Sequence, residues 1–136
     1  METIFTKIIK GQIPSVKLYE DHLATVILDI APANKGHALI ISNEVYPTIA
    51  SCPSETLQHL IKIVKKVDAV LTEKLGCDAT NVVINNGVAA NQEVPHLHIH
   101  VIPRYTDDNK KLSLPKESYQ EGELEEYGLK LRFKEI

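Results

Sequence analysis

Histidine alternates with aliphatic residues in the segment 96–102, HLHIHVI, and this alternation is the strongest constraint on the fold. A period of two indicates a β-strand, because successive side chains of a strand point to opposite faces of a sheet. The three imidazoles therefore share one face of the strand, and the aliphatic side chains share the other. We expect the aliphatic face to pack on a core and the imidazole face to present groups that titrate near neutral pH.

The composition is that of one soluble domain. A chain of 136 residues can bury a core without disulfides or a metal. The net charge of −3 does not suit a general nucleic-acid surface. No apolar run approaches the roughly 18 residues that would span a membrane, and the first residues lack the pattern of a secretory signal. Cys52 and Cys77 are interpreted as free thiols. We therefore expect a cytoplasmic protein with no nucleic-acid or membrane partner.

Hydrophobic periodicity and turn residues predict five strands and one long helix. The long helix covers residues 54–75, with Ser54 as its N-cap and Gly76 as its stop. Its apolar stripe is predicted to comprise Leu57, Leu60, Ile61, Val64, Val67, Leu71 and Leu75. A short helix is expected at residues 4–10, and strands are expected at residues 16–20, 23–29, 37–42, 81–85 and 96–102.

The third strand, residues 37–42, is nearly all apolar and is expected to be central, and Pro103 is expected to close the last strand. Residues 107–116 are predicted to be irregular. The chain end is predicted to form a helix, although the alternation of residues 129–134 would also suit a strand. Together these elements predict an α+β fold. We expect a single domain over residues 1–136, with a core at 4–105 and a C-terminal extension at 106–136.

The three alternating histidines admit two functional interpretations. In the first they bind a metal, but His96 and His100 would lie about 13 Å apart at Cα on one straight strand. Two of them would then need a further ligand, such as His37. In the second they act on phosphate, because a neutral imidazole is a nucleophile and its neighbours can donate hydrogen bonds. The histidines outside this group, His22 and His59, are interpreted as ordinary surface residues.

The loop before the histidine strand favours the phosphate interpretation. It carries neutral amide side chains that could hold phosphate oxygens without adding charge: Asn85, Asn86, Asn91 and Gln92. Plain turn chemistry is the alternative explanation of the asparagines.

At these residues the chain resembles the histidine triad (HIT) family of nucleotide hydrolases and transferases. The signature of that family is His-φ-His-φ-His-φ-φ, where φ is apolar, and residues 96–102 match it completely. Further similar segments follow in order between residue 4 and about residue 105: residues 4–9 with 13–14, 28–32 with 37–41, and 85–87 with 91–94. The resemblance implies a HIT-like fold, an antiparallel sheet of about five strands with one long helix and short terminal helices. It also implies a homodimer whose sheet continues across the two subunits.

The resemblance implies roles for four histidines. His98 would attack the α-phosphorus of a nucleotide and form a nucleotidyl-histidine intermediate. His96 would orient the site through a hydrogen bond with His37, and His100 would bind the phosphate and assist proton transfer. The reaction would be that of a nucleotide phosphohydrolase or nucleotidyl transferase acting on purine nucleotide conjugates, such as phosphoramidates or dinucleoside polyphosphates.

The same resemblance implies nucleotide-binding residues. Asp29 would accept hydrogen bonds from the ribose, although it could instead be a simple turn cap. The base pocket would be lined by Phe5, Ile8, Ile27 and Ile30, of which the last two could also be ordinary core residues. The phosphate or ribose would be contacted by Asn85 and Gln92 and by the backbone from Asn91 to Val94.

Some positions depart from the family pattern. Members with a structural zinc site carry Cys-x-x-Cys and a histidine where this chain has Thr3, Thr6 and Val45, so we expect no metal there and no cofactor. Glu93 stands where some members have Ser or Thr. The expected ligand is a purine nucleotide such as AMP. Two alternatives remain open: a nucleotide-binding regulatory module with little turnover, and a metallohydrolase using His96, His98 and His37.

Overall fold

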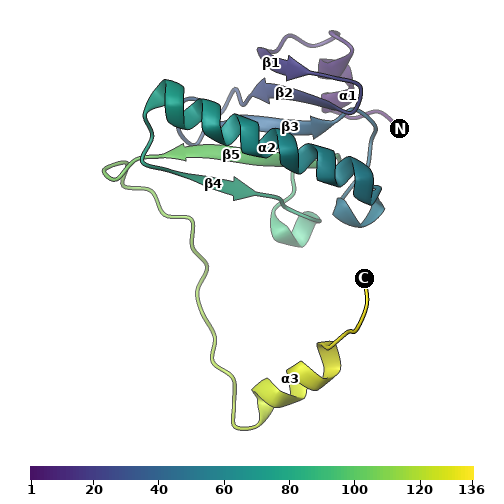
Figure 1. Ribbon diagram of the computed structural model, residues 1–136, viewed down its shortest axis with the longest axis vertical. Helices are drawn as coiled ribbons and strands as arrows, with labels where there is room; N and C mark the ends of the chain where they lie inside the picture. The colour runs from purple at the N-terminus through teal and green to yellow at the C-terminus, as the bar shows by residue number, and fades with distance from the viewer.

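A five-stranded antiparallel sheet, in the order β1-β2-β3-β5-β4, forms the centre of the protein in a computed structural model that describes residues 1–136 (Figure 1). The strands are β1 (Lys17–Glu20), β2 (Ala24–Leu28), β3 (Ala38–Ser42), β4 (Ala79–Val83) and β5 (His98–Arg104). The α-helices are α1 (Ile4–Ile9), α2 (Ser54–Leu75) and α3 (Glu123–Leu131), and there are two single 3₁₀ turns, η1 (Ile49–Ser51) and η2 (Val88–Ala90). The predicted α+β class, with about five antiparallel strands and one long helix, is confirmed.

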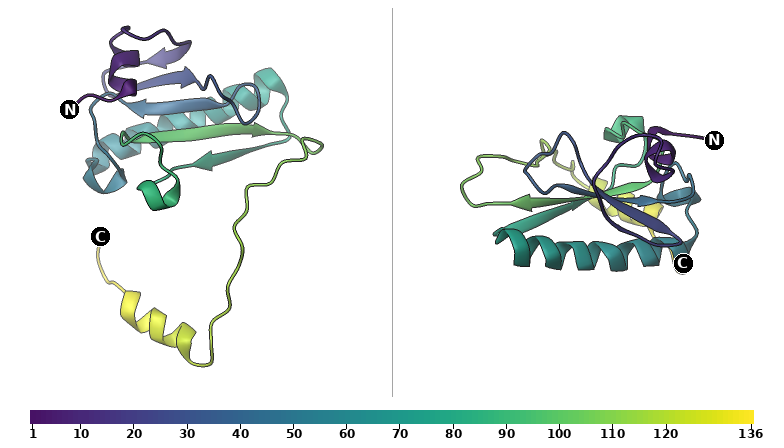
Figure 2. Two further views of the ribbon diagram at one scale, coloured as in Figure 1. Left: turned by 180° about the vertical axis from the view of Figure 1, so that it is seen from behind. Right: turned by 90° about the horizontal axis from the view of Figure 1, so that it is seen from above.

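The two faces of the sheet are covered by different helices. Seen along the sheet in Figure 2, α2 lies under one face, whereas α1 lies on the other. Alternate residues of β3 serve the two sides: Ala38 and Ile40 pack in the α2 cluster, and Leu39 and Ile41 pack in the α1 cluster. All five residues of β3 are buried, and the strand is central as predicted. Both faces of this strand are apolar because both are covered.

Helix α2 begins and ends at the predicted residues, Ser54 and Leu75, but its buried face differs in detail. Gly76 ends the helix in the left-handed conformation, with φ 64°. The N-cap is Pro53 and makes no side-chain hydrogen bond, so the prediction of Ser54 as the cap was wrong. Ile61 and Leu75, both assigned to the apolar stripe, are 46 % and 45 % exposed, whereas Ile63 is buried. Spacing alone placed Ile61 on the wrong side of the boundary of the apolar stripe.

Strand β5 begins two residues later than predicted and includes Pro103, which was expected to close it. Pairing with β3 ends at the Ala38↔Val101 pair, whereas pairing with β4 continues to Arg104. The Pro103 carbonyl accepts from Asn34 Nδ2 on the β3 side. Nitrogen and oxygen of one strand residue point to the same side, so the missing N–H of proline lies where no ladder bond is needed.

The C-terminal arm, which we define as residues 106–136, runs away from the sheet as extended chain and then forms α3 (Figure 1). The predicted C-terminal helix is confirmed, with the irregular segment before it. None of the α3 side chains is buried. No helix has the length and apolar character needed to cross a bilayer.

The neighbouring residues Leu60 and Ile61 provide a matched test of the α2 packing. Leu60 is fully buried between α2 and the sheet. We expect Leu60→Ala to lower the free energy of unfolding by about 2–5 kcal/mol, because it removes buried contacts and leaves a cavity. Ile61→Ala on the exposed side should cost much less. Urea unfolding measures both changes, and equal losses would contradict the assigned helix orientation.

Candidate active site

The histidine segment is divided between the two sides of the sheet as its alternation predicts. Leu97, Ile99 and Val101 are buried in the core cluster that packs on α2. His98 and His100 project from β5 on the α1 side, and His96 lies just before the strand. The main chain of β5 is paired with β3 on one side and β4 on the other. The imidazoles are therefore carried by a part of the backbone that has little freedom to move.

His96 is fully buried and both of its ring nitrogens are engaged. Nε2 lies 2.6 Å from the carbonyl oxygen of Ser42, so Nε2 carries the proton and donates. Nδ1 then accepts from the Thr3 hydroxyl at 2.7 Å. Thr3 is itself fixed as the N-cap of α1 through reciprocal hydrogen bonds with Thr6. Burial lowers the pKa of His96, which keeps the ring neutral.

These threonines occupy the positions at which zinc-containing members of the resembled family carry cysteines. In this chain a hydroxyl of the α1 cap holds the first triad histidine by a hydrogen bond. The sequence analysis did not foresee this contact. A Thr-x-x-Thr pattern before an apolar helix is a capping signal, but nothing in it indicates which distant ring the hydroxyl will meet.

The predicted hydrogen bond between His96 and His37 was wrong. In the antiparallel pairing of β3 with β5, Leu39 faces His100 and Ile41 faces His98. His37 precedes β3 and therefore lies beside His100, at the end of the site opposite to His96. The structure shows His37 Nε2 2.9 Å from His100 Nδ1. The pairing direction of the two strands, which the sequence motif does not encode, decided the partner.

His98 has the hydrogen bonding expected of a nucleophile. Its Nδ1 lies 2.7 Å from the carbonyl oxygen of His96, so Nδ1 carries the proton and Nε2 keeps its lone pair. Nε2 has no hydrogen-bond partner in the protein. Every fully buried side-chain nitrogen or oxygen atom of the chain does have a partner, so Nε2 is not one of the fully buried atoms. Nε2 is therefore accessible to a ligand, although the residue as a whole is only 8 % exposed. The Phe5 ring packs edge-on against this imidazole, with ring centroids 4.9 Å apart.

The charge state of His98 also suits nucleophilic attack. Burial lowers the pKa of the ring, and the effect outweighs the opposing influence of its hydrogen bond to His96 and of the carboxylates of Asp29 and Glu93. A neutral ring has a free lone pair at physiological pH. Glu93 is exposed, and its negative charge favours the protonated form of the His98 ring, which raises the pKa of that ring slightly against the effect of burial.

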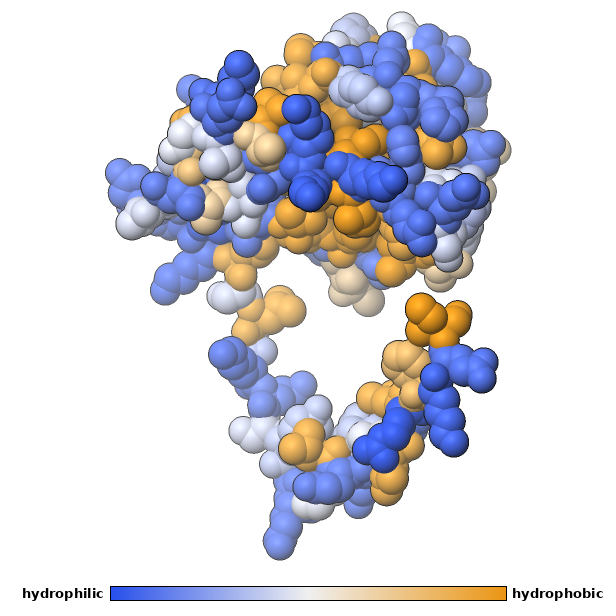
Figure 3. Space-filling view, viewed as in Figure 1, coloured by the Kyte–Doolittle hydropathy of each residue, from blue (hydrophilic) through white to orange (hydrophobic).

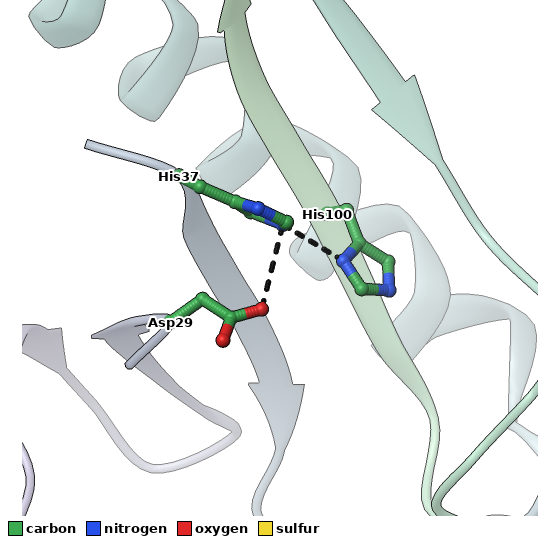
Figure 4. A group of neighbouring side chains, drawn as sticks. All are labelled: Asp29, His37 and His100. Carbon is green, nitrogen blue, oxygen red and sulfur yellow. Dashed lines mark hydrogen bonds and ion pairs between the residues drawn. The ribbon is translucent and has the colours of Figure 1, made fainter. Parts of the chain in front are cut away.

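A chain of hydrogen bonds sets the proton position on His100. The backbone N–H of Ala33 donates to His37 Nδ1 at 3.0 Å, so the proton of His37 is on Nε2. That proton is donated to His100 Nδ1, which leaves His100 with its own proton on Nε2 (Figure 4). Burial lowers the pKa of His100 to about 4, and the neighbouring rings of His98 and His37 add to the effect because they would repel it if protonated together with it. His100 is thus a neutral hydrogen-bond donor beside the nucleophile. The centroids of the His98 and His100 rings are 5.0 Å apart.

Asp29 joins this group from the end of β2. Its Oδ1 accepts from the Ala31 backbone N–H at 2.9 Å, so the turn-cap role considered for it is present. Its Oδ2 lies 3.7 Å from His37 Nε2 (Figure 4). The carboxylate is partly exposed beside the relay, and its contact with ribose remains a prediction.

Asp29, His37 and His100 are close enough to be considered as metal ligands, with ligand atoms within 4.8 Å of one another. A neutral histidine that binds a metal through Nε2 must carry its proton on Nδ1. The Nδ1 of His37 instead faces the N–H of Ala33, a donor. The metallohydrolase alternative meets a further obstacle, because both nitrogens of His96 are engaged. The hydrogen bonds therefore favour a relay of neutral imidazoles over a metal centre.

The loop before β5 is held by its own amide side chains. Gln92 is buried; its Oε1 accepts from the Gly87 N–H, and its Nε2 donates to the Pro47 carbonyl, both at 2.7 Å. Asn86 Oδ1 accepts from the Ile49 N–H at 3.0 Å. These two residues shape the loop, which is the structural alternative to direct phosphate contact.

The remaining predicted nucleotide-binding residues lie in different environments. Asn91 is exposed and in the left-handed conformation, with φ 73°, while Asn85 and Val94 are half-buried. Phe5, Ile8 and Ile27 are buried in the α1 cluster. Ile30 is 95 % exposed, so it is not a core residue. The roles of all these residues in nucleotide binding remain predictions.

Comparison with known proteins identifies relatives of this arrangement. A family model described as HIT domain matches residues 10–107. An uncharacterized HIT-like protein of Methanocaldococcus jannaschii is 48 % identical over 107 residues, which cover 79 % of this chain and 82 % of the relative. An adenosine 5'-monophosphoramidase of Schizosaccharomyces pombe is 43 % identical over 108 residues, covering 79 % and 78 %. The crystal structure of a member of the HIT family from Bacillus subtilis matches with a TM-score of 0.88 at 30 % identity, covering 100 % of both chains.

The lowered pKa values predict how stability depends on pH. Burial lowers the pKa of His37, His96, His98 and His100 in the folded protein. The unfolded chain, with ordinary values near ~6.5, then binds more protons than the folded one as the pH falls below neutral. The free energy of unfolding should therefore decrease from pH 7 to pH 5, where carboxylates with lowered pKa values stay ionised.

Urea unfolding at pH 7, 6 and 5 measures this dependence. His100→Asn, which cannot take up a proton in this range, should show a smaller decrease than the wild type. A free energy that stays constant or rises as the pH falls would contradict the assigned neutral state of these rings.

Proposed function

Because this chain belongs to the histidine triad (HIT) family, we propose that it is a nucleotide hydrolase that cleaves at the α-phosphate of purine nucleotide conjugates. The observation that carries the proposal is the free Nε2 of His98, whose Nδ1 proton is bound to the His96 carbonyl. The relative named adenosine 5'-monophosphoramidase supports a nucleoside phosphoramidate as the class of substrate. Dinucleoside polyphosphates share the same reacting α-phosphate.

In the first step, the Nε2 lone pair of His98 attacks the α-phosphorus. The bond from phosphorus to the leaving nitrogen or oxygen breaks, and the leaving group departs after taking up a proton from solvent water. The product on the protein is a nucleotidyl-histidine. The positive charge that develops on the ring is shared with the His96 carbonyl through the Nδ1–H. The pre-formed hydrogen bond costs no reorganisation at that moment.

In the second step, water attacks the same phosphorus and gives up one proton to the solvent, and the bond between phosphorus and His98 Nε2 breaks. The nucleoside monophosphate is released, and the imidazole returns to its starting tautomer. His100 acts in both steps through its Nε2–H, which donates to a phosphate oxygen on which negative charge increases. His37 keeps that proton in place by donating to His100 Nδ1. His96 orients the strand end through Thr3 and Ser42.

Recognition of the nucleotide is assigned to the ends of the site. Asp29 would accept hydrogen bonds from the ribose hydroxyls through its partly exposed carboxylate. The loop held by Asn86 and Gln92 would offer backbone N–H groups to the phosphate. The exposed side chain of Ile30 and the neighbouring α1 cluster would contact the base. We propose a homodimer as the functional form.

Removal of the nucleophile tests the proposed mechanism. We expect His98→Ala to lose at least about 10³-fold in turnover of adenosine phosphoramidate, because no other group can form the covalent intermediate. The same variant should still bind AMP, since the other contacts stay in place. His22→Ala, an exposed histidine outside the site, is the control and should keep wild-type turnover. Wild-type turnover by His98→Ala would refute the assignment.

The covalent intermediate itself can be trapped. A substrate labelled in its AMP group is allowed one turnover and then quenched in alkali, which preserves the phosphorus–nitrogen bond. Mass spectrometry should find the label on residue 98. Tight AMP binding with neither label nor product would support instead a regulatory nucleotide-binding module.

The ribose contact is tested by a substitution that keeps the turn. Asp29→Asn retains an oxygen for the Ala31 N–H but removes the charged acceptor. We expect KM to rise for a ribonucleotide substrate and to change little for its 2′,3′-dideoxy analogue, which offers no hydroxyl to the carboxylate. Equal changes in KM for both substrates would argue against the ribose role.

A further inference from the structure

The C-terminal arm has an apolar helix face that its own chain leaves largely exposed, apart from an edge-on contact between the rings of Tyr119 and Tyr127. Leu124, Tyr127 and Leu131 lie at helix positions i, i+3 and i+7, so they share one face of α3. All three are exposed. A helix of nine residues is not stable by itself in water. The arm therefore needs a surface on which α3 can pack.

The first residues of the arm are held by hydrogen bonds, and the chain after them runs away from its own sheet. Asp108 accepts hydrogen bonds from Arg104 Nε at 2.9 Å and from Asn34 Nδ2 at 3.0 Å. Lys110 Nζ donates to Asn34 Oδ1 and to the Ala33 carbonyl. The arm leaves at the end of β5, beside the edge strand β4, and both views show it running outward past that edge (Figures 1 and 2).

The solved Bacillus subtilis relative supports this course of the arm. The match covers 100 % of both chains at a TM-score of 0.88, so the matched residues include the arm. An arm of this kind is therefore shared with a solved relative.

A suitable surface lies at the opposite edge of the sheet. A hollow of about 360 Å³ between β1 and α2, here called the β1–α2 hollow, is lined mainly by apolar side chains. Leu18 and Tyr19 of β1 and Ile63 and Val70 of α2 contribute to it, with Lys62 and Lys66 also at its wall. Figure 3 shows apolar surface between charged residues on this side of the molecule, and apolar side chains along the arm.

We propose that α3 of one copy of this chain docks in the β1–α2 hollow of a second copy, with the exchange made in both directions. The acidic first turn of α3, which contains Glu123, Glu125 and Glu126, complements the lysines of the hollow. Its apolar face meets the apolar lining. Each copy both gives an arm and receives one, as a two-fold symmetric dimer requires.

The arm is long enough for this contact. Residues 106–120 span up to about 50 Å when extended. If a second copy lies with its β4 against the β4 edge of the first, its β1 and its hollow lie five strand spacings, about 24 Å, from the β4 of the first copy. The arm of the same chain starts at the wrong edge and points away from its own hollow. The proposal concerns assembly and does not depend on the proposed hydrolase activity.

Cross-linking of mixed isotope-labelled chains tests the contact directly. A photoreactive phenylalanine at position 127 of the full-length protein should form cross-links between a heavy and a light chain. Mass spectrometry should map them to β1 or to residues 62–71 of α2. Cross-links to Tyr119 within the arm are expected in either case, because the two rings are in contact. Cross-links to the β1–α2 hollow of the same chain, cross-links to any other surface of the second chain, or no cross-link between chains would each overturn the proposal.

The strength of the contact is measured by sedimentation of matched variants. Leu131→Asp on the apolar face should weaken dimerisation at least about tenfold, because it places a charge in the hollow. Leu129→Asp makes the same change on the opposite face of α3 and should leave the dimer unchanged. Val70→Asp in the hollow should reproduce the effect of Leu131→Asp. Equal behaviour of the two α3 variants would overturn the assigned face, whatever their activity.

Discussion

The division of β5 between two environments is the constraint on which the rest of the site depends. Its aliphatic side chains are locked in the core under α2, and its main chain is paired with β3 and β4. The imidazoles on the opposite face therefore inherit fixed positions from a buried strand. A loop carrying the same three histidines would have to order them at an entropic cost with each ligand it bound. In this protein the imidazoles are ordered when the chain folds, before any ligand binds.

Backbone groups then decide which nitrogen of each imidazole carries the proton. The carbonyl of Ser42 places it on Nε2 of His96, and the carbonyl of His96 places it on Nδ1 of His98. The N–H of Ala33 donates to Nδ1 of His37, which places the proton of His37 on Nε2. That proton is donated to Nδ1 of His100 and so places the proton of His100 on its own Nε2. Burial keeps these rings neutral. The result is one nucleophilic nitrogen beside one hydrogen-bond donor, produced from chemically identical side chains.

Much of the secondary structure could be predicted because its signals are local. The apolar periodicity of α2, the alternation of β5 and the stop at Gly76 each depend on a few neighbouring residues. The errors arose where the deciding contact was distant. Pro103 remains in β5 because the pairing with β3 ends at Val101. Ile61 is exposed because it lies at the margin of the apolar stripe, where spacing alone does not decide burial. His37 meets His100 rather than His96 because β3 and β5 run antiparallel.

The sequence by itself determined that three imidazoles share one face of a strand, because a period of two is a property of the extended backbone. It also determined which segments would form the sheet and the long helix, and it carried a signature specific enough to indicate the family. Only the tertiary structure decided the chemical state of each ring. That state depends on Thr3, Ala33 and the Ser42 carbonyl, which reach the histidines through packing across the sheet and which no pattern along the chain could assign to a particular nitrogen.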